Sequence, residues 1–265
     1  MEENEPDPID ALPPGVALAW GLQAPATRGP KPGLSLDRIV ATAIDLADAG
    51  GSLSAVSMNK LADALGFTTM SLYRYVRAKD DLVVLMGEAA MGRPPAPDPD
   101  HTWREALERW ARSILTMYRR HAWVFEVPIT GMPMLPNQLA WLDNALQGMA
   151  TTGLSYQEQL STALLVDGYV RSWAQLSQGI GQMGNGPADG TTGDQPSPGD
   201  MMRVLIDPVR FPALAPMVAA GEFDDDEEDI ETIFDFGLDR VLDGIEALVT
   251  ARRAAAPPKK KRKKG

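Results

Sequence analysis

The sequence predicts an all-α fold in two parts, a small N-terminal helical domain followed by a larger helical domain. Apolar residues recur at intervals of three and four along most of the chain, without the alternation that is typical of strands. Serine or threonine precedes several of these stretches and glycine follows them, as at helix ends. Four prolines between residues 92 and 100 interrupt the helical pattern, so we expect the domain boundary there.

Composition excludes several classes of protein. The 265 residues are enough for a sizeable core, and the absence of cysteine excludes disulfides, thiolate zinc sites and a cysteine nucleophile. No apolar run reaches the roughly 18 residues that a membrane span needs, and the first residues are acidic, unlike a signal peptide. We expect a soluble protein that is not exported.

Residues 1–33 precede the first helical pattern. They hold seven prolines and five acidic residues and show no sustained periodicity. This composition predicts a disordered or extended arm.

Four helices are predicted in the small domain, which we place at residues 34–90. The first begins at Leu36 after the N-cap Ser35 and ends near residue 50. The second begins at Met58 after Ser57 and ends at Gly66, a residue that tolerates the left-handed conformation. The third is expected from residue 68 to about 76, and the fourth begins near residue 79.

The larger domain is placed at residues 101–253 and contains longer helices. We expect them at about 102–120, 137–151, 155–178 and 230–252. Glycine, proline and polar residues predict a loop at 179–199, and the basic residues 254–265 predict a disordered tail.

The second and third predicted helices give the clearest indication of function. Two short helices joined by a glycine-containing turn form a helix-turn-helix unit, whose second helix enters the major groove of DNA. The outward residues of the third helix mix hydroxyls, phenols and a guanidinium opposite the inward Leu72 and Val76. Arg74 can pair with a phosphate or with guanine, and Lys79 adds a cation at a helix N-terminus. The candidate DNA-binding residues from this pattern are Ser57, Thr68, Thr69, Met70, Ser71, Tyr73, Arg74, Tyr75 and Lys79.

The charge distribution agrees with DNA binding by the small domain. The chain carries a net charge of -11, but residues 28–88 hold seven cations and seven acids, whereas residues 89–258 hold twelve cations and twenty-four acids. Only the small domain therefore offers a face on which a polyanion can bind, with modest non-specific affinity. The alternative is a small helical bundle with an ordinary polar surface.

The string LADALGFTTMSLYRYVRAKDDL, residues 61–82, resembles the DNA-binding head of the tetracycline repressor (TetR) family. Segments at residues 136–142, 167–171 and 236–240 resemble its regulatory half more loosely. The resemblance implies an all-helical bacterial homodimer that binds a palindromic operator on double-stranded DNA and releases it when a small-molecule effector enters the regulatory core. It also implies a cytoplasmic, nucleoid-associated location, and it adds Asn59 to the residues that can reach a base.

The last helix and the helix at 155–178 are the candidate dimer interface. The apolar stripe of the last helix is too wide for burial on one side, and Gly237 and Gly244 lie on it seven residues apart. Two interior glycines on one face suggest close approach of another helix, either across a dimer seam or within one chain. The candidate interface residues are Tyr169, Trp173, Gly237, Val241, Gly244 and Leu248.

Aromatic and methionine residues are concentrated between residues 100 and 175, where they can line an adaptable ligand pocket or belong to the core. Asp167 and Arg171, four residues apart on one helix, can form an ion pair or meet a polar group of a ligand. The candidate effector-binding residues are Trp110, Tyr118, Met132, Met134, Trp141, Asp167 and Arg171.

Other classes of site lack support in the sequence. His101 and His121 have no neighbouring acids at ligand spacing, and the acidic run at 224–229 lacks the glycine of a calcium loop, so we expect no metal site and no cofactor. The sequence also contains no recognisable nucleophile with its base and no phosphate-binding loop, which argues against an enzyme.

The basic tail has two interpretations. Residues 258–263, PKKKRK, resemble a short viral nuclear-localisation signal of the kind appended to recombinant proteins, and only such a tag implies a nuclear location. A native basic tail would instead add non-specific attraction to DNA.

The sequence therefore predicts a ligand-responsive, dimeric DNA-binding transcriptional regulator, most simply a repressor. The rival hypothesis is a structural DNA-binding protein that responds to no ligand and binds all sequences alike.

Overall fold

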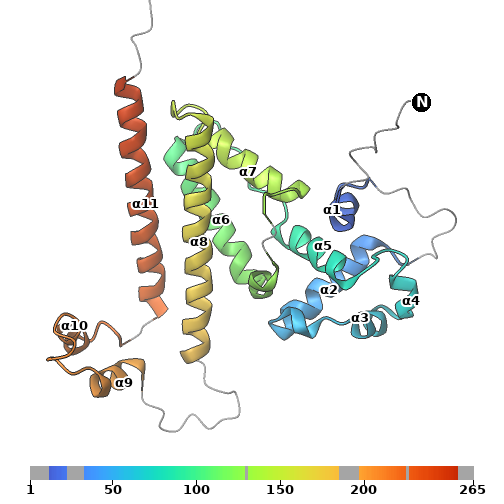
Figure 1. Cartoon of the computed structure of the whole chain (residues 1–265), viewed down its shortest axis with the longest axis horizontal. Coiled ribbons are helices and arrows are strands. Elements are labelled where there is room, and N and C mark those ends of the chain that lie inside the picture. Colours follow the sequence, from blue (N-terminus) through green and yellow to red (C-terminus); the bar gives the residue numbers. More distant parts are fainter. Residues whose placement is uncertain (1–11, 23–32, 129–130, 185–196, 225–226, 256–265) are drawn as a thin grey trace, which may run out of the picture. The chain divides into compact units, whose positions relative to one another are not determined.

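The computed structural model describes residues 12–22, 33–128, 131–184, 197–224 and 227–255 (Figure 1). Throughout these residues the regular structure is helical, with eleven α-helices and two short 3-10 helices, η2 and η3. This confirms the predicted all-α class. None of the helices in these ranges is long and apolar enough to cross a membrane.

The chain forms two compact units. One contains residues 1–174 and 245–265, and the other contains residues 175–244. The boundaries fall inside α8 (Tyr156–Gly184) and α11 (Glu227–Ala255). The division into a head at 34–90 and a regulatory domain at 101–253 stays a prediction.

A short helix, α1 (Pro14–Ala19), lies within the segment for which the sequence predicted a disordered or extended arm. That prediction was wrong for these residues. Pro14 occupies the first turn, where its missing N–H costs nothing, and Gly15, Val16 and Ala17 are buried where α1 packs on α5. Six residues are too few to show a helical period, so only tertiary packing identifies this helix. The rest of the arm lies outside the described residues.

The head contains α2 (Leu36–Gly50), η2 (Leu53–Ala55), α3 (Met58–Leu65), α4 (Thr69–Leu72) and α5 (Lys79–Met91). The predicted ends of α2 are confirmed, because the Ser35 hydroxyl accepts from the Arg38 N–H and Gly51 is left-handed. α2 packs against α3 and α5, and α3 packs against α4. The centre of this core consists of Ile39, Leu61, Leu72, Val76, Leu82 and Met86, all fully buried.

The following helices are α6 (Trp103–Arg120), η3 (Ala122–Glu126), α7 (Pro136–Gly148) and α8. A capping box of Thr102 and Glu105 fixes the start of α6, as two backbone donors find side-chain acceptors. α6 packs against α7, and both contact α5, so the last helix of the head also supports the region that follows.

The second unit contains two helices that the sequence did not predict, α9 (Pro198–Leu205) and α10 (Ala215–Ala220). Both are too short for a clear period, although Ser197 caps the N-terminus of α9 and the left-handed Gly221 ends α10. Residues 179–184 are helical and do not belong to the loop predicted at 179–199, because α8 continues to Gly184. Residues 185–196 and the basic tail from 256 lie outside the described residues.

Candidate DNA-binding surface and effector pocket

The turn between α3 and α4 has the features that the sequence predicted. The Ser57 hydroxyl accepts from the Lys60 N–H at 3.2 Å, which caps α3, and Gly66 ends it at φ 74°. The Phe67 N–H then donates to the Ala62 carbonyl at 3.0 Å, closing the turn after the helix. Local hydrogen bonds therefore fix the direction in which the chain enters α4.

The predicted recognition helix, α4, is shorter than the sequence indicated, because regular α-helix ends at Leu72 rather than near Val76. Tyr75 and Val76 each donate a backbone N–H to the Leu72 carbonyl, so a tight turn replaces further helix. Burial of both Leu72 and Val76 holds this turn, and the chain must then extend at Ala78 to begin α5. The Thr68 hydroxyl bonds to the Ser71 hydroxyl at 3.0 Å and does not cap the backbone.

Most of the predicted DNA-binding residues lie on one accessible part of the head. Met70 is 74% exposed and Tyr73 is 44% exposed, which is unusual for large apolar side chains of a closed core. The exposed members are Asn59, Thr68, Met70, Tyr73, Arg74 and Lys79, and the half-buried members are Ser57, Thr69, Ser71 and Tyr75. Their position on successive short elements suits contact with the edges of a groove.

Tyr75 differs from its predicted role as a DNA-contacting residue. Its hydroxyl donates to the Leu34 carbonyl at 3.0 Å, and this bond ties the turn after α4 to the start of α2. The phenol therefore positions the recognition helix, while the hydroxyl of the exposed Tyr73 is better placed to reach a phosphate.

A set of hydrogen bonds that the sequence did not reveal joins the head to η3. Asp48 at the end of α2 accepts from Trp123 Nε1 at 2.6 Å and lies 2.9 Å from His121 Nδ1. The Glu126 carboxylate accepts the backbone N–H of Leu53 at 3.2 Å. Because these partners are more than seventy residues apart in the chain, no local pattern predicts them. They couple the head to the segment that follows α6, next to the pocket described below.

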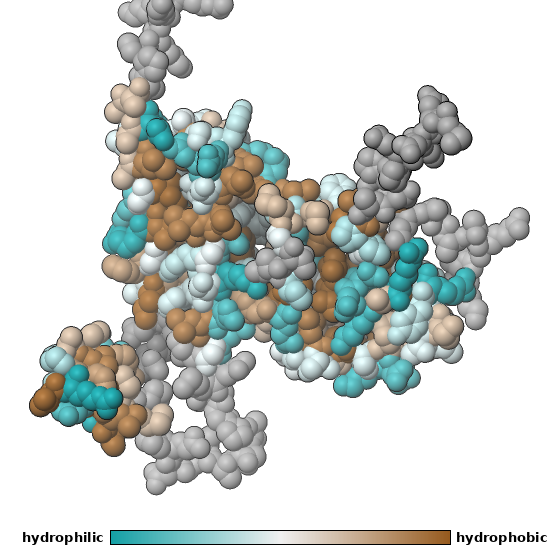
Figure 2. All heavy atoms as spheres, viewed as in Figure 1, coloured by the Kyte–Doolittle hydropathy of each residue, from teal (hydrophilic) through white to brown (hydrophobic). Residues whose placement is uncertain are grey.

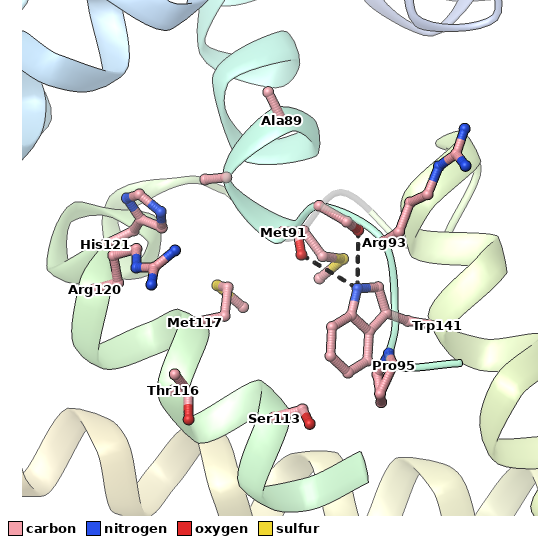
Figure 3. A pocket seen from close by; sticks show the side chains of 12 residues that line it. Ala89, Met91, Arg93, Pro95, Ser113, Thr116, Met117, Arg120, His121 and Trp141 are labelled. Atoms are coloured by element: carbon pink, nitrogen blue, oxygen red, sulfur yellow. Dashed lines mark hydrogen bonds between the residues drawn. The ribbon is translucent and has the colours of Figure 1, made fainter. Parts of the chain in front are cut away.

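The pocket in Figure 3 has a volume of about 470 Å³ and lies among the end of α5, α6 and α7. The Trp141 indole N–H donates to the carbonyls of Met91 and Gly92 at 3.3 and 3.0 Å, which joins α7 to the end of the head (Figure 3). The polar side chains that line the pocket are basic or neutral, and none of its described lining residues carries a carboxylate. These polar side chains are Arg93, Ser113, Thr116, Arg120 and His121.

Only one of the predicted effector-binding residues, Trp141, lines this pocket. Trp110 lies behind it, where its N–H donates to the Trp141 carbonyl at 2.9 Å and its ring meets the Trp141 ring edge-on. Met132 and Met134 are exposed and line a different cavity. Periodicity could not separate these three roles, because each depends on which neighbour covers the side chain.

The remaining predicted residues form a cluster between α6, η3 and α8. The Arg171 guanidinium donates to the Tyr118 hydroxyl at 3.2 Å and lies 5.3 Å from the centre of the Phe125 ring, which stacks on Tyr118. Burial raises the pKa of Asp167, and the nearby Arg171 charge opposes that rise. Burial likewise raises the pKa of Tyr118. The cluster is tightly packed, and it stays a candidate for polar contact with an effector.

The predicted interface residues lie on α8 and α11. Gly244 is exposed, and the other five are half-buried, namely Tyr169, Trp173, Gly237, Val241 and Leu248. A Cβ atom placed on Gly244 would have no neighbour within 4 Å among the described residues, so packing within this chain does not require glycine there. On α8, Leu160, Leu164 and Leu165 are 41%, 71% and 55% exposed, and Figure 2 shows apolar surface over this helix.

Known proteins share both the sequence and the architecture. The family model for the tetracyclin repressor-like C-terminal domain matches residues 96–249. A transcriptional repressor from Streptomyces coeruleorubidus, DrrR1, is 37% identical over 241 residues, which cover 89% of this chain and 86% of the relative. The solved structure of apo ActR from Streptomyces coelicolor is 25% identical, covers 86% of this chain and 100% of ActR, and has a TM-score of 0.65. ActR in complex with actinorhodin matches with the same identity and TM-score over 82% of this chain and 98% of ActR.

The fold and these matches together define the class of protein. The chain belongs to the tetracycline repressor family of helix-turn-helix transcriptional regulators. It is a DNA-binding repressor rather than an enzyme, and relatives such as ActR bind small molecules.

Proposed function

We propose that two copies of this chain bind a palindromic operator through α3 and α4 and release it when a small molecule binds beside α5. The observation that carries the proposal is the accessible surface around α4, where Met70, Tyr73 and Arg74 are exposed, in a chain of this family. Nine of the ten residues predicted for DNA contact are retained in that role, and Tyr75 is instead a positioning residue, because its hydroxyl donates to the Leu34 carbonyl.

The exposed leucines of α8 support a dimer. Leu164 and Leu165 present apolar surface that folding of one chain leaves in water, and the open space beside Gly244 admits a second helix. Two helices from each copy would form a four-helix bundle. Paired heads then read two half-sites about 34 to 36 Å apart, which is one turn of DNA.

The effector pocket of Figure 3 supports a link between ligand and DNA. It is lined by the last residues of α5, and a ligand that moves this helix shifts the head that α5 helps to build. Two arginines and a histidine without a carboxylate favour an anionic or acceptor-rich aromatic effector, with Trp141 as a stacking surface. The complex of ActR with actinorhodin supports a small molecule as the effector.

Selection of bound duplexes from a random pool tests the DNA half of the proposal. At about 0.15 M salt, where non-specific attraction is already weakened, a palindrome should be recovered. Recovery of no motif by folded protein would favour the rival hypothesis of a structural DNA-binding protein.

The effector half is tested with the recovered duplex and a panel of anionic and neutral aromatic compounds. A compound that dissociates the complex should act on Arg120→Gln only at concentrations about tenfold higher or more, because the variant loses a charged donor in the pocket. Arg119→Gln, on the same helix but outside the pocket lining, is the matched control. Equal responses of both variants would remove this pocket from the mechanism.

A further inference from the structure

A second cavity, of about 440 Å³, lies between α1, α5 and the start of α7. Its walls are mainly aliphatic, with Val16 from α1, Val83 and Val84 from α5, and Val127 and Leu135 from the segment after η3. This volume falls in the range of sites for small organic ligands, which are mostly apolar with a few placed polar groups.

Helix α1 forms one wall and is fastened at both ends of the cavity. A Cβ atom on Gly15 would lie 3.2 Å from Val84 Cγ1, so the glycine permits close contact between α1 and α5. The Trp20 indole N–H donates to the Met134 carbonyl at 2.7 Å, which ties the end of α1 to the opposite wall. The cavity is therefore built by three separate parts of the chain.

Glu88 gives the cavity its charge. The residue is buried, with 8% of its surface exposed, and Oε1 accepts the Asn137 N–H at 2.5 Å. Oε2 is buried and has no well-aligned hydrogen bond from the described residues, although the Gln138 N–H lies close enough to the carboxylate to lower the pKa of Glu88. Asp80 and Asp81 also line the cavity, whereas none of its lining residues in the described part of the chain is a lysine, arginine or histidine.

We propose that this cavity is a second ligand site that binds a small apolar amine or related organic cation, with its charge on Glu88 Oε2. A buried carboxylate oxygen without a well-aligned donor is unfavourable, and an ammonium group supplies both the donor and the opposite charge. The aliphatic walls then cover the apolar part of the ligand.

This cavity and the pocket in Figure 3 differ in the charge of the side chains that line them. A cation is attracted by the three carboxylates of the second cavity and repelled by Arg93 and Arg120 of the first. The inference does not rest on the proposed DNA function, because binding to the second cavity is measured without DNA.

The test uses three probes of similar size and different charge, 4-phenylbutylamine, 4-phenylbutanol and 4-phenylbutyrate, titrated into the full chain and followed by ligand-observed NMR. The amine should bind tightest and the carboxylate weakest. Glu88→Gln, which preserves shape and an acceptor for Asn137, should weaken amine binding about tenfold or more. It should leave the alcohol nearly unchanged.

Glu222→Gln is the control for general attraction of amines to an acidic protein, because Glu222 is exposed and does not line the cavity. Met132→Trp adds a bulky ring at an exposed position on the cavity rim and should weaken both the amine and the alcohol. Absence of amine binding, equal binding of the three probes, or equal effects of Glu88→Gln and Glu222→Gln would overturn the proposal. The probe series on the unmodified chain keeps the test decisive if Glu88→Gln fails to fold.

Discussion

The proposed recognition face around α4 and the proposed effector pocket beside α7 hold their side chains in different ways. Met70 and Tyr73 on the recognition face stand in solvent, whereas Trp110 and Trp141 at the pocket are 4% and 5% exposed and donate hydrogen bonds to backbone carbonyls. The head can therefore change what it reads without changing its core. Trp141, which lines the pocket, and Trp110, which lies behind it, cannot be replaced so freely, because these side chains hold α6, α7 and the end of α5 together.

The largest expected difference between these regions is in stability. Trp110→Ala should lower the free energy of unfolding by about 3 to 5 kcal/mol, because it leaves a cavity beside Trp141. Met70→Ala, on the recognition face, should change it by less than about 0.5 kcal/mol. Chemical denaturation of both variants measures this contrast, and similar values for the two would contradict it.

The next largest expected effect is on the affinity for DNA. Arg74→Ala should weaken binding to the preferred duplex by about 1 to 3 kcal/mol and should reduce the preference over a scrambled duplex, with stability almost unchanged. Arg210→Ala removes the same charge from an exposed position in the other unit and is the control. Fluorescence anisotropy on both duplexes separates the cases. A uniform loss on both would indicate that Arg74 only contacts phosphate.

A smaller effect distinguishes two hydroxyls at the start of neighbouring helices. Ser57→Ala should cost about 1 kcal/mol of stability, because its hydroxyl caps α3. Thr68→Ala should cost less, since its hydroxyl bonds only to the Ser71 side chain. Thermal unfolding of the pair measures the difference. If the order were reversed, capping would not be what fixes the start of α3.

The smallest effect is a pH dependence far from the head. Bonds from Arg252 and from Ser155 lower the pKa of Glu158 from 4.5 to about 2. The ionised carboxylate therefore stabilises the fold above about pH 4.5, and this contribution is lost as the pH falls toward 2. Glu158→Gln should be less stable near neutral pH and should approach the unmodified protein in acid. Unfolding curves that stay parallel down to pH 2 would contradict this assignment.

Helix ends in the head could be predicted from the sequence where they depend on neighbouring residues. Ser35, Ser57 and Gly66 form caps with partners within five residues, so the sequence alone indicates where α2 and α3 begin or end. The end of α4 depends instead on burial of Val76 and on the extended start of α5, and the periodic pattern placed it too late.

Longer-range contacts explain what could not be predicted. Asp48 and Glu126 join the head to η3 across more than seventy residues, and Glu88 joins α5 to α7 across forty-nine. Met132 and Trp141 looked equivalent as candidate pocket residues, but one lines the acidic cavity and the other the basic pocket. Glu88 accepts the Asn137 N–H at the start of α7 and also lines the acidic cavity, and both roles depend on the tertiary arrangement.

We propose that two copies read two half-sites of one operator. Light scattering tests this by measuring the mass of the complex on the recovered duplex and on the same duplex with one half scrambled. We expect two chains on the intact duplex and a large loss of affinity when either half is scrambled. One chain per duplex, with equal affinity for the intact and half-scrambled sequences, would contradict it.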